Sequence, residues 1–263
     1  MGTERLRYRK YGEAPHNVVA VHGGPGAAGE MAPVARELSS THGVIEPWQT
    51  ADSIPGQVKE LSYCIEQVAD APVILIGFSW GAWLSLLTAT EYPELVRKVV
   101  IIGSGPFESV YASMISEVRR SRMNIEQRAR VDLLTEKMTS NADDEALCEL
   151  GRLMSAVDAY DLLRSSDENI QCSYAIYDKV WREASALRRS GRLLEKVMQV
   201  RCPVTAIHGD HDPHPAMGVE KPLSSMACSF KFFLLQRCGH KPWIERHAKD
   251  LFYEVLKNEI ENK

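Results

Sequence analysis

The 263-residue sequence has no long apolar run, because no stretch approaches the roughly 20 apolar residues that a membrane-spanning helix requires. The first ten residues, MGTERLRYRK, are charged from the fourth position and contain no apolar core, unlike a secretory signal. Basic residues are not in excess, since the formal net charge is −4. We therefore expect neither a membrane nor a nucleic acid as a partner.

Cysteine pairs at short spacing are also missing. The six cysteines are scattered without a CxxC pair, which argues against a disulfide framework or a zinc ribbon and favours a reducing, cytoplasmic location. One local basic cluster is present, formed by Arg119, Arg120 and Arg122. We interpret this cluster as the solvent-exposed face of a helix.

The sequence does contain an alternation of short apolar runs and helical patterns. Helices are predicted at residues 56–68, 82–91 and about 243–257. Buried strands are predicted within residues 18–21, 43–48, 72–77, 99–102, 204–207 and 229–236. Strands that are apolar on both faces and separated by helices predict an α/β fold with a mostly parallel sheet, covered by helices on both faces.

Residues 106–200 interrupt this alternation. They contain no convincing strand, only polar stretches with the pattern of amphipathic helices. The segment is too long for an ordinary connection between two strands. We interpret it as a helical cap folded over the carboxyl end of the sheet. The predicted core is then made of residues 1–105 and 201–263.

The pentapeptide GFSWG, residues 77–81, lies between the apolar run VILI and a Leu-rich helical pattern. In this strand–turn–helix context it matches G-x-S-x-G, where a nucleophilic serine occupies a tight turn that the glycines permit. Ser79 is therefore the candidate nucleophile. The alternative is a serine with a purely structural role in a turn.

The sequence HGGPG, residues 22–26, follows the first predicted strand. Glycines there allow backbone amides to approach a ligand without side-chain obstruction, although an ordinary loop would also use them. We predict that the amides of Gly24 and Trp80 form an oxyanion hole. His22 is predicted to support the loop by hydrogen bonding.

A serine nucleophile needs a base, and the base needs a partner that fixes its tautomer. The segment HGDHDPHP follows the strand at 204–207, and CGHKPW follows the last strand. An acid after one strand and a histidine after the next give the order Ser, Asp, His. Asp212 and His240 are the predicted acid and base, and Asp210 is predicted to bond loop amides instead.

The same histidine-rich segment could be a metal site, since His208, Asp210, His211, Asp212 and His214 all carry ligand atoms. The residues belong to one loop and lack the helical H-E-x-x-H spacing. We therefore predict no metal and no cofactor, with His208 and His214 as parts of the loop scaffold.

Together, HGGPG, GFSWG, the acid in HGDHD and the histidine in CGH resemble the α/β-hydrolase superfamily. The pairing of HGGPG with GxSWG resembles the proline iminopeptidase branch in particular. The resemblance covers about residues 6–103 and 201 to the C-terminus, and it implies an α/β-hydrolase fold. The family's HGxxD pattern falls on Asp212.

Two features depart from that branch. Its DQRGxGxS-like stretch is replaced by EPWQTADSIPGQ. In the branch, acidic residues of the cap hold the free amino group of the substrate; here Glu145, Glu149, Asp158 and Asp161 are available, but acidic residues on cap helices more often belong to a solvated surface.

The predicted function is that of a serine hydrolase that cleaves a small carboxylic ester or amide through an acyl-enzyme on Ser79. The cleaved bond could also be an activated carbon–carbon bond, because the cap determines the shape of the pocket and the sequence does not reveal that shape. The alternatives are an aminopeptidase similar to proline iminopeptidase and a non-catalytic protein that binds a small molecule in the same fold. The sequence predicts no oligomeric state.

Overall fold

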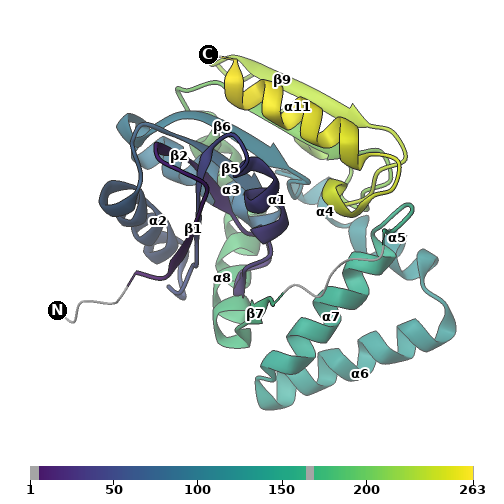
Figure 1. Ribbon diagram of the computed structural model, residues 1–263. Coiled ribbons are helices and arrows are strands. Elements are labelled where there is room, and N and C mark those ends of the chain that lie inside the picture. Colours follow the sequence, from purple (N-terminus) through teal and green to yellow (C-terminus); the bar gives the residue numbers. More distant parts are fainter. Residues whose placement is uncertain (1–5, 164–168, 263) are drawn as a thin grey trace.

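The computed structural model describes residues 6–163 and 169–262, which form an α/β structure around a seven-stranded sheet (Figure 1). Across the sheet the strands are β1 (Tyr8–Tyr11), β4 (Gly43–Pro47), β2 (His16–Val21), β5 (Val73–Phe78), β6 (Val96–Ile102), β8 (Val204–Gly209) and β9 (Phe230–Leu235). β1 runs antiparallel to β4, and every other neighbouring pair in this sheet is parallel. The predicted mostly parallel sheet is confirmed.

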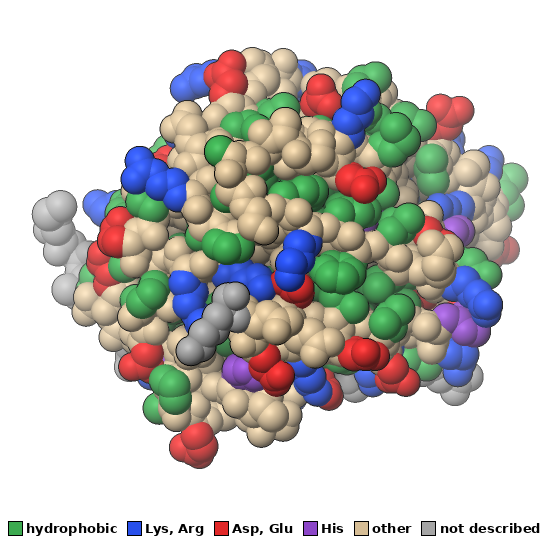
Figure 2. All heavy atoms as spheres, turned by 90° about the horizontal axis from the view of Figure 1, so that it is seen from above, with side chains coloured by type: hydrophobic (Ala, Val, Ile, Leu, Met, Phe, Trp, Pro, Cys, Tyr) green, Lys and Arg blue, Asp and Glu red, His purple; other side chains and the backbone are tan. Residues whose placement is uncertain are grey.

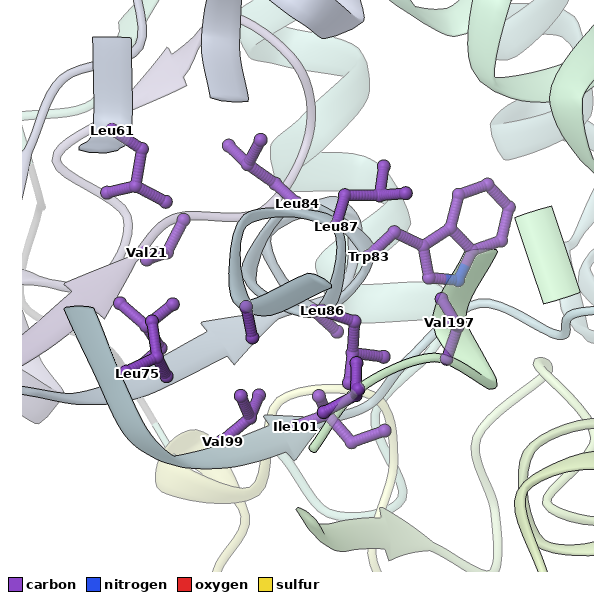
Figure 3. Close-up of a cluster of buried hydrophobic side chains, with 14 of the residues drawn as sticks. Val21, Leu61, Leu75, Trp83, Leu84, Leu86, Leu87, Val99, Ile101 and Val197 are labelled. Carbon is purple, nitrogen blue, oxygen red and sulfur yellow. The ribbon is translucent and has the colours of Figure 1, made fainter. Parts of the chain in front are cut away.

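Helices cover both faces of the sheet, because the central strands are apolar on both sides; all six residues of β5 are buried. On one face, α2 (Ile54–Val68) and α3 (Trp80–Glu91) pack in one hydrophobic cluster. Figure 3 shows α3 end-on, with its leucines beside the side chains of the strands. On the other face, α1 (Ala32–Leu38) and α11 (Lys249–Glu261) pack in a second cluster.

The C-terminal helix begins six residues later than the predicted start at residue 243. Pro242–Ile244 form a single 3₁₀ turn, and the buried carboxylate of Glu245 accepts backbone N–H groups of Tyr160, Asp161 and Gly239. These bonds hold the segment as a loop and displace the helix start to Lys249.

The segment between β6 and β8 is mainly helical. Its elements are α4 (Ser109–Ala112), α5 (Ile115–Arg122), α6 (Ile125–Asn141), α7 (Asp144–Val157), β7 (Gln171–Cys172), α8 (Tyr174–Arg189) and α9 (Arg192–Val197). In Figure 1, α6 and α7 project away from the sheet, and they pack around a small cluster of their own. By contrast, α8 and α9 contribute side chains to the main cluster beside α3. The division into core and cap stays a prediction.

Two features of this segment differ from the sequence prediction. The strand β7, where no strand was expected, pairs antiparallel with β3 (Ala27–Ala28), directly after the HGGPG loop. Cys148 of α7 and Cys172 of β7 form a disulfide, although the cysteine spacing argued against a disulfide framework. Spacing could not reveal this pair, because its 24-residue separation is closed by tertiary packing.

The surface carries both signs of charge. On the face seen in Figure 2, basic and acidic side chains are interspersed. Of the helices in the two described ranges, none combines the length and apolar character needed to cross a membrane.

Candidate active site

The candidate residues meet at one edge of the sheet. Gly24 follows β2, Ser79 follows β5, Asp212 follows β8 and His240 follows β9. Because these four strands are parallel, their carboxyl ends lie at the same edge, where ligands bind in open α/β sheets.

Ser79 occupies a sharp turn between β5 and α3. Its φ of 51° and ψ of −111° place it in the left-handed region that non-glycine residues rarely adopt. The flanking glycines make the turn possible: a Cβ on Gly77 would overlap the carbonyl of Gly81, and a Cβ on Gly81 would overlap that of Val21. Such strain, which costs about 1–3 kcal/mol, is concentrated at functional sites.

His240 and Asp212 are joined by a hydrogen bond. His240 Nδ1 lies 2.7 Å from Asp212 Oδ2, and both residues are 8% exposed. Burial raises the pKa of Asp212, but electrostatic interaction with His240, His214 and His208 and the hydrogen bond from His214 outweigh it and hold this pKa well below its usual value. The carboxylate is therefore ionised and accepts the Nδ1–H of His240, which leaves Nε2 free to act as a base.

Asp212 has a second histidine partner, His214, which the sequence analysis assigned to the loop scaffold. Its Nδ1 lies 2.7 Å from Asp212 Oδ1, and its backbone N–H donates to the same oxygen at 2.8 Å. The ring stacks on His240 with centroids 4.3 Å apart. Burial lowers the pKa of His214 to about 4, so the ring is neutral at pH 7. His208 Nε2 pairs with the carbonyl of His214 at 2.8 Å.

Asp212, His214 and His240 also bring potential ligand atoms within 4.8 Å of one another. Both carboxylate oxygens of Asp212 already accept an imidazole, each at 2.7 Å. The arrangement thus satisfies its own polar atoms by hydrogen bonds, and the absence of a metal requirement stays a prediction.

Asp210 lies on the exposed side of the same loop. Its Oδ1 accepts the backbone N–H of Cys238 at 3.1 Å, whereas Asp212 faces inward to the histidines. This geometry agrees with the different roles expected for the two aspartates.

The HGGPG loop lies beside the serine turn. Gly24 and Trp80 line the same cavity as Ser79. His22 is fully buried, with Nδ1 2.8 Å from the carbonyl of Gly23, and burial lowers its pKa. Its Nε2 accepts the backbone N–H of Gln49 at 3.4 Å. His22 therefore supports the loop by hydrogen bonds as neutral imidazole.

A cavity of about 910 Å³ lies over these residues, with walls from the strand ends and from α5, α7 and α8. Ser79 and His240 both line it. Several aromatic side chains line it as well, namely Trp80, Trp83, Tyr177, Trp181 and Trp243. This volume is in the range of small-molecule sites.

The arginine cluster of α5 is not simply a solvated face, which corrects the sequence interpretation. Arg119 lies on the cavity wall and pairs with the buried Asp158 through Nε and Nη2, with the Nη2 bond at 2.5 Å. Arg122 is partly buried and donates to the carbonyl of His211. Arg120 is mainly exposed. A charge run alone could not distinguish these three environments.

The four acidic residues considered for an amino group do not line the cavity. Glu149 pairs with Arg130 at 2.6 Å, Asp158 with Arg119, and Asp161 with Arg246 at 3.2 Å. Glu145 is exposed. Among the described residues, the one acid on the cavity wall is Glu30, whose Oε1 pairs with Lys241 at 2.7 Å.

Comparison with known proteins gives a consistent fold assignment. The Alpha/beta hydrolase family matches residues 18–255. Proline iminopeptidase from Lactobacillus helveticus (strain DPC 4571) is 24% identical over 276 aligned positions, which cover 94% of this chain and 91% of that protein. Ethanol acetyltransferase 1 from Cyberlindnera jadinii is 31% identical over 94 residues; they cover 35% of this chain and only 27% of that protein. Est816, described as an N-acyl homoserine lactone degrading enzyme, superposes with a TM-score of 0.64 at 16% identity, covering 96% of both chains.

Proposed function

Because this chain belongs to the alpha/beta hydrolase family, we propose that it is a serine hydrolase that cleaves a small carboxylic ester or amide. One observation carries the proposal: Ser79 in its strained turn and His240 line one cavity, and His240 is hydrogen-bonded to the buried Asp212. Nucleophile, base and orienting acid are the three roles that acyl transfer to a serine requires.

In the first half of the reaction, Ser79 Oγ attacks the carbonyl carbon while His240 Nε2 takes the hydroxyl proton. The negative charge that develops on the carbonyl oxygen accepts hydrogen bonds from the backbone N–H groups of Gly24 and Trp80. The tetrahedral intermediate then expels the alcohol or amine, which leaves with the proton from His240. The acyl group stays on Ser79.

In the second half, water attacks the acyl carbon and His240 Nε2 takes a proton from it. Breaking of the Ser79 ester bond releases the carboxylic acid, and the proton returns from His240 to Ser79 Oγ. Asp212 keeps the Nδ1–H tautomer of His240 throughout and stabilises the imidazolium that forms twice in each cycle.

A second candidate is an aminopeptidase similar to proline iminopeptidase, which the full-length similarity favours. The charges of the cavity favour the generic hydrolase instead. A free amino group needs an unpaired carboxylate, and the one described acid on the wall, Glu30, already pairs with Lys241. A non-catalytic binding protein is the third candidate; it would have no need for the strained Ser79 turn.

A fluorophosphonate probe tests the nucleophile. Wild-type protein is expected to be labelled covalently at Ser79, with intact-mass and peptide mass spectrometry as the readout, because the probe needs an activated serine beside a base. Ser79→Ala is expected to show no labelling. Ser104, which is buried and bonds the carbonyl of Gly105, supplies a matched serine, and Ser104→Ala should be labelled like the wild type.

Labelling that persists in Ser79→Ala would place the nucleophile elsewhere. A wild-type protein that folds, takes no label and turns over no ester would support the binding-protein alternative.

A further inference from the structure

The cavity wall has many more cations than carboxylates, although the whole chain has a net charge of −4. Among the described residues, Glu30 is the one carboxylate on the wall. The cationic side chains on the wall are Arg119, Arg120, Arg128, Arg152, Arg188 and Lys241. The excess of positive charge is therefore a property of the cavity and not of the composition.

Two of these cations are neutralised within the protein. Arg119 forms the pair with Asp158, and Lys241 forms the pair with Glu30. Arg120 lies 3.8 Å from Asp132, with both side chains about two-thirds exposed, so solvent weakens that pair.

Arg188 differs from these cations because it is partly buried and has no ion pair with a described residue. In the described part of the chain it has neither an ion pair nor a hydrogen bond, and its Nε is buried without a partner. A buried N–H group without an acceptor destabilises the folded protein, and more so when the group is charged. Such a group is rare in a folded protein, and the guanidinium that carries it lines the cavity, where a ligand can accept from its other N–H groups.

Aromatic rings orient Arg188 toward the cavity. Its Cζ lies 5.5 Å from the centre of the Trp83 ring, and Trp83 stacks nearly parallel to Trp181 at an interplanar angle of 10°. Trp181 and Arg188 are seven residues apart on α8 and hence on one face of the helix. A guanidinium whose face lies on a ring keeps its N–H groups at the edge for an anion.

Arg188 shares the cavity wall with the candidate nucleophile Ser79, and Trp83 contacts Arg188 from the helix that Ser79 begins. Trp83 follows Ser79 by four residues, about one turn of α3, and all three side chains line the same cavity. A planar carboxylate matches the paired N–H donors of a guanidinium in a bidentate pair.

We propose that this cavity takes an acyl substrate that carries a carboxylate, and that Arg188 binds the carboxylate while the ester or amide carbonyl lies at Ser79. The proposal rests on the proposed serine hydrolase function for its chemistry, but binding of the carboxylate at Arg188 can be measured without hydrolysis. Half-esters of linear dicarboxylic acids are the simplest substrates of this class.

The first experiment compares matched esters. The 4-nitrophenyl half-esters of succinate, adipate and suberate are assayed beside their methyl-capped forms, which differ in one negative charge. The half-ester of the best length is expected to have at least a tenfold higher kcat/KM than its methyl-capped form. A ratio near one at every length would overturn the proposal.

Two arginine variants assign the effect. Arg188→Gln is expected to reduce the ratio of kcat/KM for the half-ester to kcat/KM for the capped ester at least tenfold. Arg188→Lys keeps the charge but not the paired N–H donors, and it is expected to reduce this ratio by less. Arg189→Gln is the matched control, because Arg189 is exposed, does not line the cavity and lies in the same last turn of α8. An equal loss in Arg189→Gln would indicate a long-range charge effect and overturn the assignment.

Binding to Ser79→Ala separates the site from the reaction. Calorimetric titration is expected to show that monomethyl adipate binds at least tenfold more tightly than dimethyl adipate, and that the double variant Ser79→Ala/Arg188→Gln loses this preference. If wild-type protein hydrolyses no ester but this binding preference is found, the hydrolase function fails and the anion site stands. If esters are hydrolysed without any preference in turnover or binding, the anion site fails and the hydrolase function stands.

Discussion

At the scale of single residues, the site is organised around one carboxylate. Asp212 accepts three hydrogen bonds, from His240 Nδ1, His214 Nδ1 and the backbone N–H of His214, while His208 Nε2 lies 3.5 Å away. One carboxylate oxygen of Asp212 accepts from His240 and the other accepts from His214, and the His214 ring stacks on the His240 ring. The position of His240 is therefore fixed both by its hydrogen bond to Asp212 and by its contact with His214. The orientation of His240 therefore depends on His214 as well as on Asp212.

Replacement of Asp212 by Asn is expected to lower kcat by about three to four orders of magnitude, because the amide can donate to Nδ1 and stabilise the wrong tautomer of His240. Initial rates with a 4-nitrophenyl ester give the measurement. Asp210→Asn is the control, since Asp210 contacts the Cys238 amide and neither histidine, and it should stay within a few-fold of wild type. A rate near wild type for Asp212→Asn would refute the assignment of the acid.

The buried His214 predicts a pH dependence of stability. In the unfolded chain its pKa is near 6.5, and burial lowers it to about 4 in the folded protein. Between these values the unfolded state binds the proton first, so acidification from pH 6.5 to about 4 lowers the free energy of unfolding, on the order of 3 kcal/mol from this group. Urea unfolding at a series of pH values measures the decrease.

His214→Asn is the matched variant, because its amide can still donate to Asp212 while no titration remains. The variant should lose less stability over the same pH range than wild type. Burial also lowers the pKa values of His22 and His211, and these groups contribute equally to both proteins. Identical slopes in the two proteins would rule out the proposed titration of His214.

Sequence reasoning placed some of these residues and not others for physical reasons. Ser79 and Asp212 follow the buried strands β5 and β8, whereas His240 follows β9, a partly exposed edge strand that the sequence analysis expected to be buried. Their common location follows from the parallel pairing of these strands. Arg188 and His214 have no such signal, because their roles depend on side chains that lie far away in the sequence or on ring stacking.

At the scale of elements, the buried strands and the apolar edge strand β9 were predictable because their apolar runs are nearly continuous, while the strands β1 and β7 were not. The strand β1, with the sequence YRKY, is partly exposed at the sheet edge and carries two basic residues. The strand β7 has only two residues and is set by pairing with β3. Strands of this kind depend on a partner and carry too few apolar residues to form a pattern.

The disulfide between α7 and β7 predicts a redox-dependent stability. Cys148 and Cys172 both line the cavity, and β7 pairs with the strand that follows the HGGPG loop. For a closed loop of this 24-residue separation, reduction is expected to lower the free energy of unfolding by about 3 kcal/mol in the chain-entropy treatment. Urea unfolding with and without dithiothreitol measures the change.

Cys148→Ser is the control, since its stability should not respond to dithiothreitol. A thiol titration of the unfolded, unreduced protein should find four thiols, those of Cys64, Cys202, Cys228 and Cys238. Six titratable thiols before reduction would show that the bond is absent in solution.

At the scale of the whole molecule, charge is distributed unevenly between surface and cavity. Acidic and basic side chains alternate on the face in Figure 2, and several acids of the helical segment pair with arginines. Among the charged residues that line the cavity between the strand ends and this segment, most are cations. Motif order could predict which residues form the candidate site, but the charge of the cavity depends on packing and could not be predicted from the sequence.

This charge distribution predicts discrimination against a free amino group. At pH 7 the amino group of L-proline methyl ester is mostly protonated, whereas N-acetyl-L-proline methyl ester is neutral. Repulsion by the cationic wall is expected to make kcat/KM for the N-acetyl ester roughly tenfold higher, a difference of about 1.4 kcal/mol, as measured by pH-stat titration. An enzyme of the iminopeptidase type would show the opposite order.

That opposite order would direct attention to Glu30, because its Oε2 is buried without a hydrogen-bond partner and Glu30 is the one described acid on the wall. Glu30→Gln would then be expected to abolish the preference for the free amine, and a preference that survived Glu30→Gln would point to a carboxylate elsewhere.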